Sequence, residues 1–159
     1  MAFLRTNIEF IISFFASDEV DEIWITFCDP QMKKATKRLT SSWFMARYSH
    51  LLREDGKIHL KTDSPFLYIY TKELVRINQF AVLADMDDLY AAAEKPELDE
   101  ARALQTHYEH QWLERGMKIK YLCWQLPQRE TYEEPDIEIE KDDYRSYGRF
   151  GRTNDNVKM

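Results

Sequence analysis

One short apolar run and the residues that end it constrain the fold most. Residues 23–27 read Ile-Trp-Ile-Thr-Phe, and β-branched and aromatic side chains in so short a run favour a buried β-strand. Pro30 cannot donate to a strand ladder and biases Asp29 toward an extended conformation, so the strand stops here. We therefore expect Asp29 at the carboxyl end of a strand, the edge at which open α/β sheets bind their ligands.

A cluster of cations follows this carboxylate directly. It consists of Lys33, Lys34, Lys37 and Arg38. Clustered cations beside a ligand-binding edge are typical of a phosphate-binding surface, whereas the same cations on a solvated loop need no partner. The cluster alone leaves both interpretations open.

Short strand-like runs alternate with segments whose apolar residues follow helical spacing. Strands are expected over residues 2–4, 22–27, 57–62 and 117–126. Helical spacing covers residues 8–15, 44–51, 67–77 and 98–112, with Gly56 and Gly116 as stops for the second and fourth of these helices. Residues 80–95 fit either a short helix or an irregular connection. Alternating strands and helices indicate an α/β fold.

The net charge of −6 is distributed unevenly along the 159 residues. Residues 130–143 contain eight acids and one lysine, a charge of −7, so the other residues together carry +1. A nearly neutral body with a local basic cluster does not exclude nucleic acid as a partner, because phosphate binding needs clustered cations and not an overall basic chain. We expect one domain over residues 1–128. Residues 129–159 have few apolar side chains to bury, which predicts a flexible tail.

Several patterns bear on location and on metals. Cys28 and Cys123 lie in apolar runs without a Cys-x-x-Cys pair, as expected for reduced thiols in the cytoplasm. Glu9 interrupts the first apolar stretch, which argues against a secretion signal, and no run reaches the roughly 20 apolar residues of a membrane span. His107 and His110 have no third ligand at metal-binding spacing, so we expect no metal site.

Four motifs occur in the order and approximate spacing of one enzyme family. They are Phe27-Cys28-Asp29-Pro30 with the four cations, residues 52–56, His59-Leu60-Lys61-Thr62-Asp63, and Thr106-His107-Tyr108-Glu109. From about residue 2 to residue 126 the chain therefore resembles the tRNA (guanine-N7)-methyltransferases. The family's Pro-Asp-Pro-Trp is represented here by Cys28, Asp29, Pro30 and Gln31.

The resemblance implies a Rossmann-like class I methyltransferase fold that transfers a methyl group from S-adenosylmethionine to N7 of guanine 46 in the variable loop of tRNA. Guanine N7 carries a free lone pair, so the reaction needs in-line positioning and a nearby anion rather than a base. The resemblance assigns that catalytic role to Asp29. The residues that it assigns to the cofactor are Asn7, Asp29, Thr106 and Glu109. It assigns to tRNA or its guanine Lys33, Lys34, Lys37, Arg38, Thr62, Asp63, Thr106, Tyr108 and Glu109.

Part of the family domain has no counterpart in this sequence. None of the four glycines forms the loop between a strand and a helix that lets a backbone approach a nucleotide cofactor. In the family that loop precedes the part that matches residue 2, so we expect the first two βα units to be missing. A central strand edge would then be uncovered, which favours self-association or rearrangement of the N-terminal segment.

We therefore expect a weakly active or inactive part of a tRNA (guanine-N7)-methyltransferase. One alternative is a non-catalytic RNA-binding or protein-interaction module with the same fold, and another is a structural subunit that completes its sheet with a partner chain. Asp29, Thr106 and Glu109 favour the enzyme, since phosphate binding alone has no use for inward-facing acids. Residues 62–65 also fit a plain helix cap.

Overall fold

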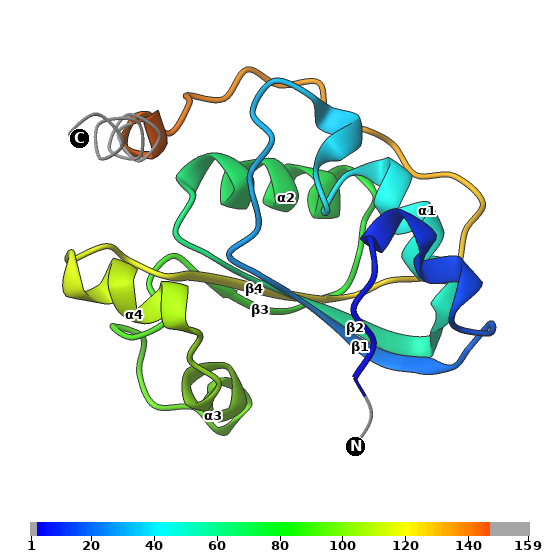
Figure 1. The fold of residues 1–159 in the computed structure, drawn as a ribbon, viewed down its shortest axis with the longest axis horizontal. Helices are drawn as coiled ribbons and strands as arrows, with labels where there is room; N and C mark the ends of the chain where they lie inside the picture. The colour runs from blue at the N-terminus through cyan, green and yellow to red at the C-terminus, as the bar shows by residue number, and fades with distance from the viewer. Residues whose placement is uncertain (1–2, 147–159) are drawn as a thin grey trace, which may run out of the picture.

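The structure is a computed structural model that describes residues 3–146 of the chain, and a mixed β-sheet forms its centre (Figure 1). The strands are β1 (Val20–Thr26), β2 (Leu52–Thr62), β3 (Val82–Met86) and β4 (Lys120–Gln125), in the order β1-β2-β4-β3. β1 and β2 run parallel, and β4 runs antiparallel to both of its neighbours. The expected α/β fold is confirmed.

Helices cover both faces of this sheet. They are α1 (Ser42–Leu51), α2 (Pro65–Ile77), α3 (Pro96–Ala103) and α4 (His107–Glu114). α1 and α2 lie on one side of the sheet, and α3 and α4 lie on the other (Figure 1). The described residues also contain the 3₁₀ turns η1 (Ile8–Ser13), η2 (Ala35–Lys37) and η3 (Asp143–Ser146). None of the helices within residues 3–146 combines the length and the hydropathy that crossing a bilayer requires.

Successive residues of β4 face two different cores, as the alternation of a strand requires. Leu122 and Trp124 pack into the larger core together with side chains of α1 and α2. Tyr121 and Cys123 pack into a smaller core that includes Leu98 of α3. The sheet is therefore a fixed support for the loops that follow β1 and β2.

β2 begins directly after α1 and is longer than the strand expected over residues 57–62. Leu51 ends the helix, and Leu52 already belongs to the strand. The sequence suggested that Gly56 stops this helix. Instead, Gly56 lies inside β2. A Cβ at Gly56 would lie 2.8 Å from Leu52 Cβ, so the strand needs glycine at this close approach.

Two helices replace the single helix expected over residues 98–112. The break lies at Thr106, whose Oγ1 accepts a hydrogen bond from Glu109 N (3.2 Å), while Glu109 Oε2 accepts one from Thr106 N (3.3 Å). This capping box starts α4. Residues 80–95 contain the edge strand β3, which neither of the two expected alternatives included.

The segment before β1 differs from the expected strand and core helix. Residues 3 and 4 have no regular structure, and residue 2 lies outside the described residues. Asn7 caps η1 as a helix-capping residue should, since Asn7 Oδ1 accepts a hydrogen bond from Glu9 N (3.1 Å). However, η1 is a 3₁₀ turn without a buried residue, because few of its apolar side chains find a core to pack against.

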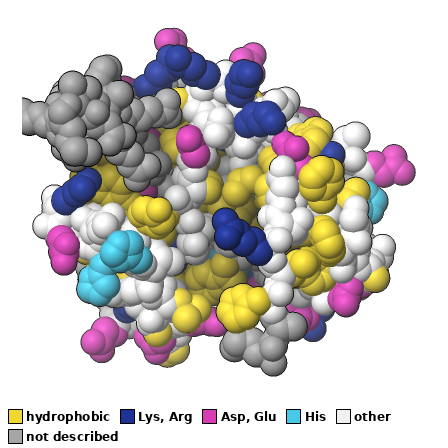
Figure 2. Space-filling view, viewed as in Figure 1, with side chains coloured by type: hydrophobic (Ala, Val, Ile, Leu, Met, Phe, Trp, Pro, Cys, Tyr) yellow, Lys and Arg dark blue, Asp and Glu magenta, His cyan; other side chains and the backbone are white. Residues whose placement is uncertain are grey.

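The outer side of β1 is an open edge, since no strand within residues 3–146 pairs with it. The sequence predicted an uncovered strand edge of this kind. Exposed apolar side chains precede the edge in the chain, namely Phe3, Leu4, Phe10, Ile12, Phe14 and Phe15. Figure 2, viewed from the side on which this segment passes in front of the sheet, shows hydrophobic side chains across the middle of the face. Self-association through the open edge stays a prediction.

Residues 129–144, which we call the C-terminal strap, lie along the body of the protein where a flexible tail was expected. The ring of Tyr132 packs edge-on against Phe80, with 5.6 Å between the ring centroids. Asn78 accepts a hydrogen bond from Glu133 N and donates one to Glu133 O, both at 2.8 Å. Polar anchors thus hold a segment that has few apolar residues to bury. The expected tail residues 147–159 lie outside the described residues.

A buried histidine lies in β2 on the face of the smaller core. The ring of His59 stacks on Trp24, with 3.9 Å between the ring centroids, and its Nδ1 lies 2.9 Å from the hydroxyl of Tyr121. Its Nε2 lies 3.3 Å from Glu22 Oε2 but without the alignment of a hydrogen bond. Burial lowers the pKa of His59, while Glu22 opposes the decrease and Lys57 adds to it.

We expect this buried histidine to make folding stability fall as the pH drops below 6.5. Unfolded His59 takes up a proton near its ordinary pKa of 6.5, whereas the folded protein keeps it neutral to a lower pH, so the unfolded state binds more protons in this window. Urea denaturation at about pH 7 and about pH 5.5 should show a smaller loss of unfolding free energy in His59→Phe than in the unchanged protein. The exposed His50 provides the control His50→Phe. An equal loss in all three proteins would contradict this prediction.

Candidate nucleic-acid interface and base site

The loop after β1 presents Asp29 between two residues with unusual backbone geometry. Phe27 N donates to Lys61 O (2.9 Å), which extends the pairing of β1 with β2 by one residue. Phe27 and Gln31 have φ angles of 50° and 47°, a left-handed conformation that costs free energy in residues other than glycine. Asp29 lies between them with an exposed side chain, and its Oδ1 accepts a hydrogen bond from Gln31 N (2.9 Å). The carboxylate is therefore held at the carboxyl end of β1, as the sequence indicated.

Arg38 differs from the other three cations of the cluster because its side chain is buried. The guanidinium donates to the backbone carbonyls of residues 30–32 at 3.1, 3.2 and 3.5 Å. It also lies over the rings of Phe66 (4.8 Å) and Tyr70 (4.3 Å). The geometry thus gives Arg38 the role of holding the loop against α2, in place of the phosphate contact that the resemblance assigned.

The remaining three cations, Lys33, Lys34 and Lys37, are exposed. Lys37 Nζ lies 3.2 Å from Glu9 Oε1, and both side chains are about half exposed, so this ion pair is worth little and remains open to exchange. Glu9 belongs to the turn that Asn7 caps, which places Asn7 near the lysines. The oxygen of Asn7 already serves the cap, so Asn7 lies at the margin of the site.

The carboxyl end of β2 carries Thr62 and Asp63, both fully buried. Thr62 Oγ1 accepts a hydrogen bond from Ser64 N (3.1 Å), and Ser64 Oγ accepts one from Leu67 N (3.0 Å). The helix-cap interpretation therefore accounts for Thr62 and Ser64. Asp63 Oδ2 accepts a hydrogen bond from the hydroxyl of Tyr144 (2.6 Å).

Glu109 is used inside the protein, whereas Thr106 is half-buried and caps α4. Glu109 is fully buried, and its Oε2 lies 2.8 Å from Lys61 Nζ, whose side chain is also fully buried. Glu109 Oε1 accepts a hydrogen bond from the hydroxyl of Tyr90 (2.7 Å). Together with the capping box, these contacts engage both oxygens. Tyr108, on the other side of α4, is 62% exposed.

Lys61 is a structural centre of this region that the motifs did not single out. Its Nζ donates to Ala101 O (2.5 Å) and Leu104 O (3.0 Å) in addition to Glu109. It therefore ties the end of α3 and the start of α4 to β2. Burial lowers the pKa of Lys61, and Glu109 opposes this decrease. The sequence did not distinguish Lys61 from Lys57 of the same strand, because its burial depends on the distant segments that it contacts.

Parallel pairing brings the two acids to one edge of the sheet. Thr26 of β1 pairs with Lys61 of β2, so Asp29 and Asp63 each follow their strand at the same edge. Exposed lysines border this edge on the β1 side, and α4 borders it on the β2 side. Acceptor carboxylates beside mobile cations can hold the donor groups of a base and the phosphates next to it.

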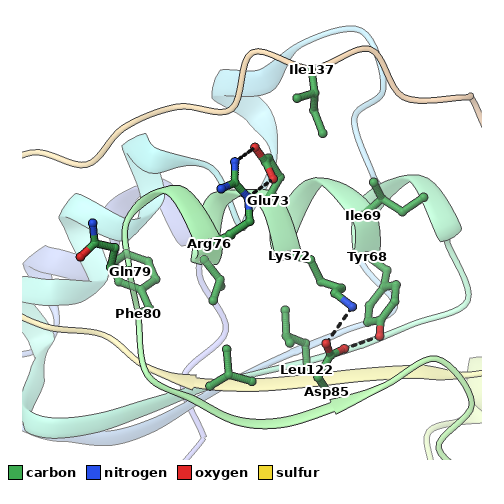
Figure 3. A pocket seen from close by; sticks show the side chains of 12 residues that line it. Tyr68, Ile69, Lys72, Glu73, Arg76, Gln79, Phe80, Asp85, Leu122 and Ile137 are labelled. Atoms are coloured by element: carbon green, nitrogen blue, oxygen red, sulfur yellow. Dashed lines mark hydrogen bonds and ion pairs between the residues drawn. The ribbon is translucent and has the colours of Figure 1, made fainter.

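A cavity of about 530 Å³ lies elsewhere, between α2 and β3 (Figure 3). Its charged groups neutralise one another, because Lys72 pairs with Asp85 and Arg76 pairs with Glu73, both at 2.7 Å. None of the site residues expected from the sequence lines it. The cavity therefore does not coincide with the candidate site residues. The exposed charge beside Asp29 makes the edge of the sheet that carries Asp29 the better candidate for the functional site. Within residues 3–146 no group of three or more His, Cys, Asp or Glu side chains could hold a metal ion.

Comparison with known proteins now decides the family. A family model described as "Putative methyltransferase" matches residues 1–122. The chain belongs to this methyltransferase family. The resemblance drawn from the motifs is confirmed.

The relatives named tRNA (guanine-N(7)-)-methyltransferase include the following three. One from Bacteroides thetaiotaomicron is 55% identical over 153 residues, which cover 96% of this chain and 60% of the relative. One from Porphyromonas gingivalis is 54% identical over 154 residues, covering 96% and 62%. One from Cytophaga hutchinsonii is 36% identical over 127 residues, covering 79% and 57%. The chain thus spans about three fifths of the length of these relatives.

Membership of this family implies S-adenosylmethionine as the methyl donor, so the described residues can be tested for its fit. Gly56 lies inside β2, and Gly116 (φ 71°) follows α4, so neither forms a loop between a strand and the start of a helix. Two of the four residues assigned to the cofactor have other contacts: Glu109 is buried in an ion pair with Lys61, and half-buried Thr106 caps α4. The described residues therefore do not form a complete cofactor site.

Proposed function

We propose that this chain supplies the tRNA-contacting and base-holding part of a tRNA (guanine-N7)-methyltransferase that acts in the cytoplasm. The observation that carries the proposal is the position of Asp29, exposed at the carboxyl end of β1 and next to Lys33 and Lys34. The names of the relatives supply the reaction, and guanine 46 is the proposed target within tRNA. S-adenosylmethionine is the proposed methyl donor of the complete enzyme.

In this proposal Asp29 holds the target guanine and stabilises the positive charge that develops on the ring when N7 is methylated. The lone pair on N7 is free in neutral guanine, so the protein need only align the base and offer a fixed anion. The left-handed conformation of Phe27 and Gln31 fixes the turn that presents this anion. Asp63 and Tyr108 line the approach of the base, and the lysines contact phosphates.

The proposed contact of the exposed lysines with tRNA phosphates can be tested by mutation. Replacing Lys33, Lys34 and Lys37 together by alanine should weaken tRNA binding and reduce the slope of log K against log salt by about 2–3, because each lost phosphate contact removes about 0.7–0.9. Filter binding at several salt concentrations measures this slope. The control replaces Arg53, Lys72 and Arg76, three exposed cations outside the loop, and should keep the full slope. An unchanged slope in the loop variant would remove the lysines from the interface.

A non-catalytic RNA-binding module is the second candidate, and the burial of Glu109 in its ion pair with Lys61 favours it. Such a module would also bind tRNA in a salt-sensitive way. It would not depend on Asp29 for any chemical step, so the Asp29 variant described in the Discussion separates the two functions.

A further inference from the structure

The second half of the C-terminal strap lies beside the loop that carries the lysines, and its end reaches the edge that carries the two acids (Figure 1). Asp142 N lies 3.2 Å from Met32 Sδ, which joins the strap to that loop. Glu134 Oε2 accepts a hydrogen bond from Ser42 N (3.0 Å) at the start of α1, and Glu134 Oε1 accepts one from the hydroxyl of Tyr70. The strap therefore crosses from the far end of the sheet to the candidate site.

A second strap carboxylate holds the start of α2. Asp142 Oδ1 accepts a hydrogen bond from Phe66 N (3.0 Å), and its Oδ2 accepts one from the hydroxyl of Ser64. Carboxylates are stabilised at helix N-termini by the free backbone N–H groups and by the helix dipole. This contact positions the residues that follow Asp142 directly in front of Asp63.

Tyr144 closes the approach to Asp63. Its hydroxyl donates to Asp63 Oδ2 (2.6 Å), and its ring meets Trp112 of α4 edge-on, with 5.6 Å between the centroids. Asp63 is 0% exposed. The phenol of Tyr144 thus binds the carboxylate that the donor groups of a guanine would use. Both rings are flat, and both donate hydrogen bonds. A base can reach Asp63 only after Tyr144 has moved.

The negative charge of the strap also disfavours RNA binding at the loop that carries the lysines. Residues 130–143 carry a charge of −7, and the second half of the strap runs beside the loop that carries the exposed lysines. RNA phosphates and strap carboxylates carry the same sign of charge, and like charges repel within the Debye length of about 8 Å at physiological salt. Closure of the strap therefore weakens RNA binding.

We propose that the C-terminal strap is an autoinhibitory gate that tRNA displaces, with Tyr144 on Asp63 as its latch. This inference rests on the proposed function, because the competing ligand is tRNA. The strap and the RNA exclude each other, so each lowers the apparent affinity of the other by the same factor. Loosening the latch should raise tRNA affinity without a new contact to RNA.

The test uses Tyr144→Phe and Asp142→Asn in the full 159-residue chain. Each should bind tRNA about three- to tenfold more tightly in filter-binding titrations, since Tyr144→Phe removes one charge-assisted contact that holds the strap closed and Asp142→Asn weakens two. Asp99→Asn, at an exposed acid of α3, makes the same charge change as Asp142→Asn outside the strap and should leave the affinity nearly unchanged. Hydrogen exchange of the strap amides should also increase when tRNA is added to the unchanged protein. Circular dichroism confirms that each variant is folded.

The outcomes separate the gate from the proposed function. Unchanged or weaker binding by a folded Tyr144→Phe, with salt-sensitive binding by the unchanged protein, would overturn the gate and leave the function standing. Binding by the variants alone would support the gate strongly. No salt-sensitive binding by any of the proteins would overturn both.

Discussion

Replacing Lys61 by methionine is expected to lower the free energy of unfolding by about 3–5 kcal/mol, because it leaves the buried carboxylate of Glu109 without its cation. Two backbone carbonyls, those of Ala101 and Leu104, would lose their donor at the same time. Methionine fills a similar volume, so the loss measures the interaction rather than a cavity. Urea denaturation followed by circular dichroism gives the free energy.

Two further variants show whether this loss of unfolding free energy comes from the buried ion pair. Lys57→Met, in the same strand but with a side chain that is 42% exposed, should cost less than about 1 kcal/mol. Adding Glu109→Gln to Lys61→Met removes the stranded charge and should restore a large part of the stability. A loss below about 1 kcal/mol in Lys61→Met would mean that the buried pair does not hold α3 and α4 to the sheet.

Replacing Asp29 by asparagine is expected to lower the rate of methyl transfer by about 10²–10³-fold, the usual effect of removing one preorganised electrostatic group from a transition state. The assay needs a complete enzyme. A chimera provides it, in which the part of the Bacteroides thetaiotaomicron relative that this chain does not match is joined to this chain. Incorporation of labelled methyl groups into tRNA measures the rate.

Asparagine keeps an oxygen that can accept the hydrogen bond from Gln31 N, so the turn should survive and tRNA affinity should change by less than about twofold. Asp55→Asn, at an exposed acid of β2, is the matched control and should retain the rate of the chimera. Loss of tRNA binding together with the rate would show that Asp29 supports the loop rather than the reaction. A full rate in Asp29→Asn would remove it from the chemistry.

Local signals in the sequence predicted the parts of the fold that depend on neighbouring residues. Pro30 correctly located the end of β1, and Pro65 after Ser64 correctly marked the start of α2. The Thr-x-x-Glu pattern of Thr106 and Glu109 is a capping-box signature, so the break between α3 and α4 was also readable. β3 could not be predicted from the sequence, because Val82–Met86 is an edge strand with mostly exposed side chains. Its polar and apolar residues do not alternate clearly.

The candidate site could be predicted only in part, because burial of charge depends on residues far away in the chain. Nothing near Arg38 in the sequence shows that Phe66 and Tyr70 enclose its guanidinium. Similarly, acidic composition predicted a tail, whereas Asp142 is held by the start of α2. The contacts of charged side chains at helix N-termini are set by tertiary structure and leave no local periodic signal.

We propose that residues 3–146 carry the RNA-contacting part of a methyltransferase site and do not form a complete cofactor site. Calorimetric titration of the 159-residue chain with S-adenosylmethionine, in parallel with filter binding of tRNA, tests it most directly. The predicted result is salt-sensitive binding of tRNA without measurable heat from the cofactor. Tight cofactor binding, or the absence of tRNA binding, would contradict the claim.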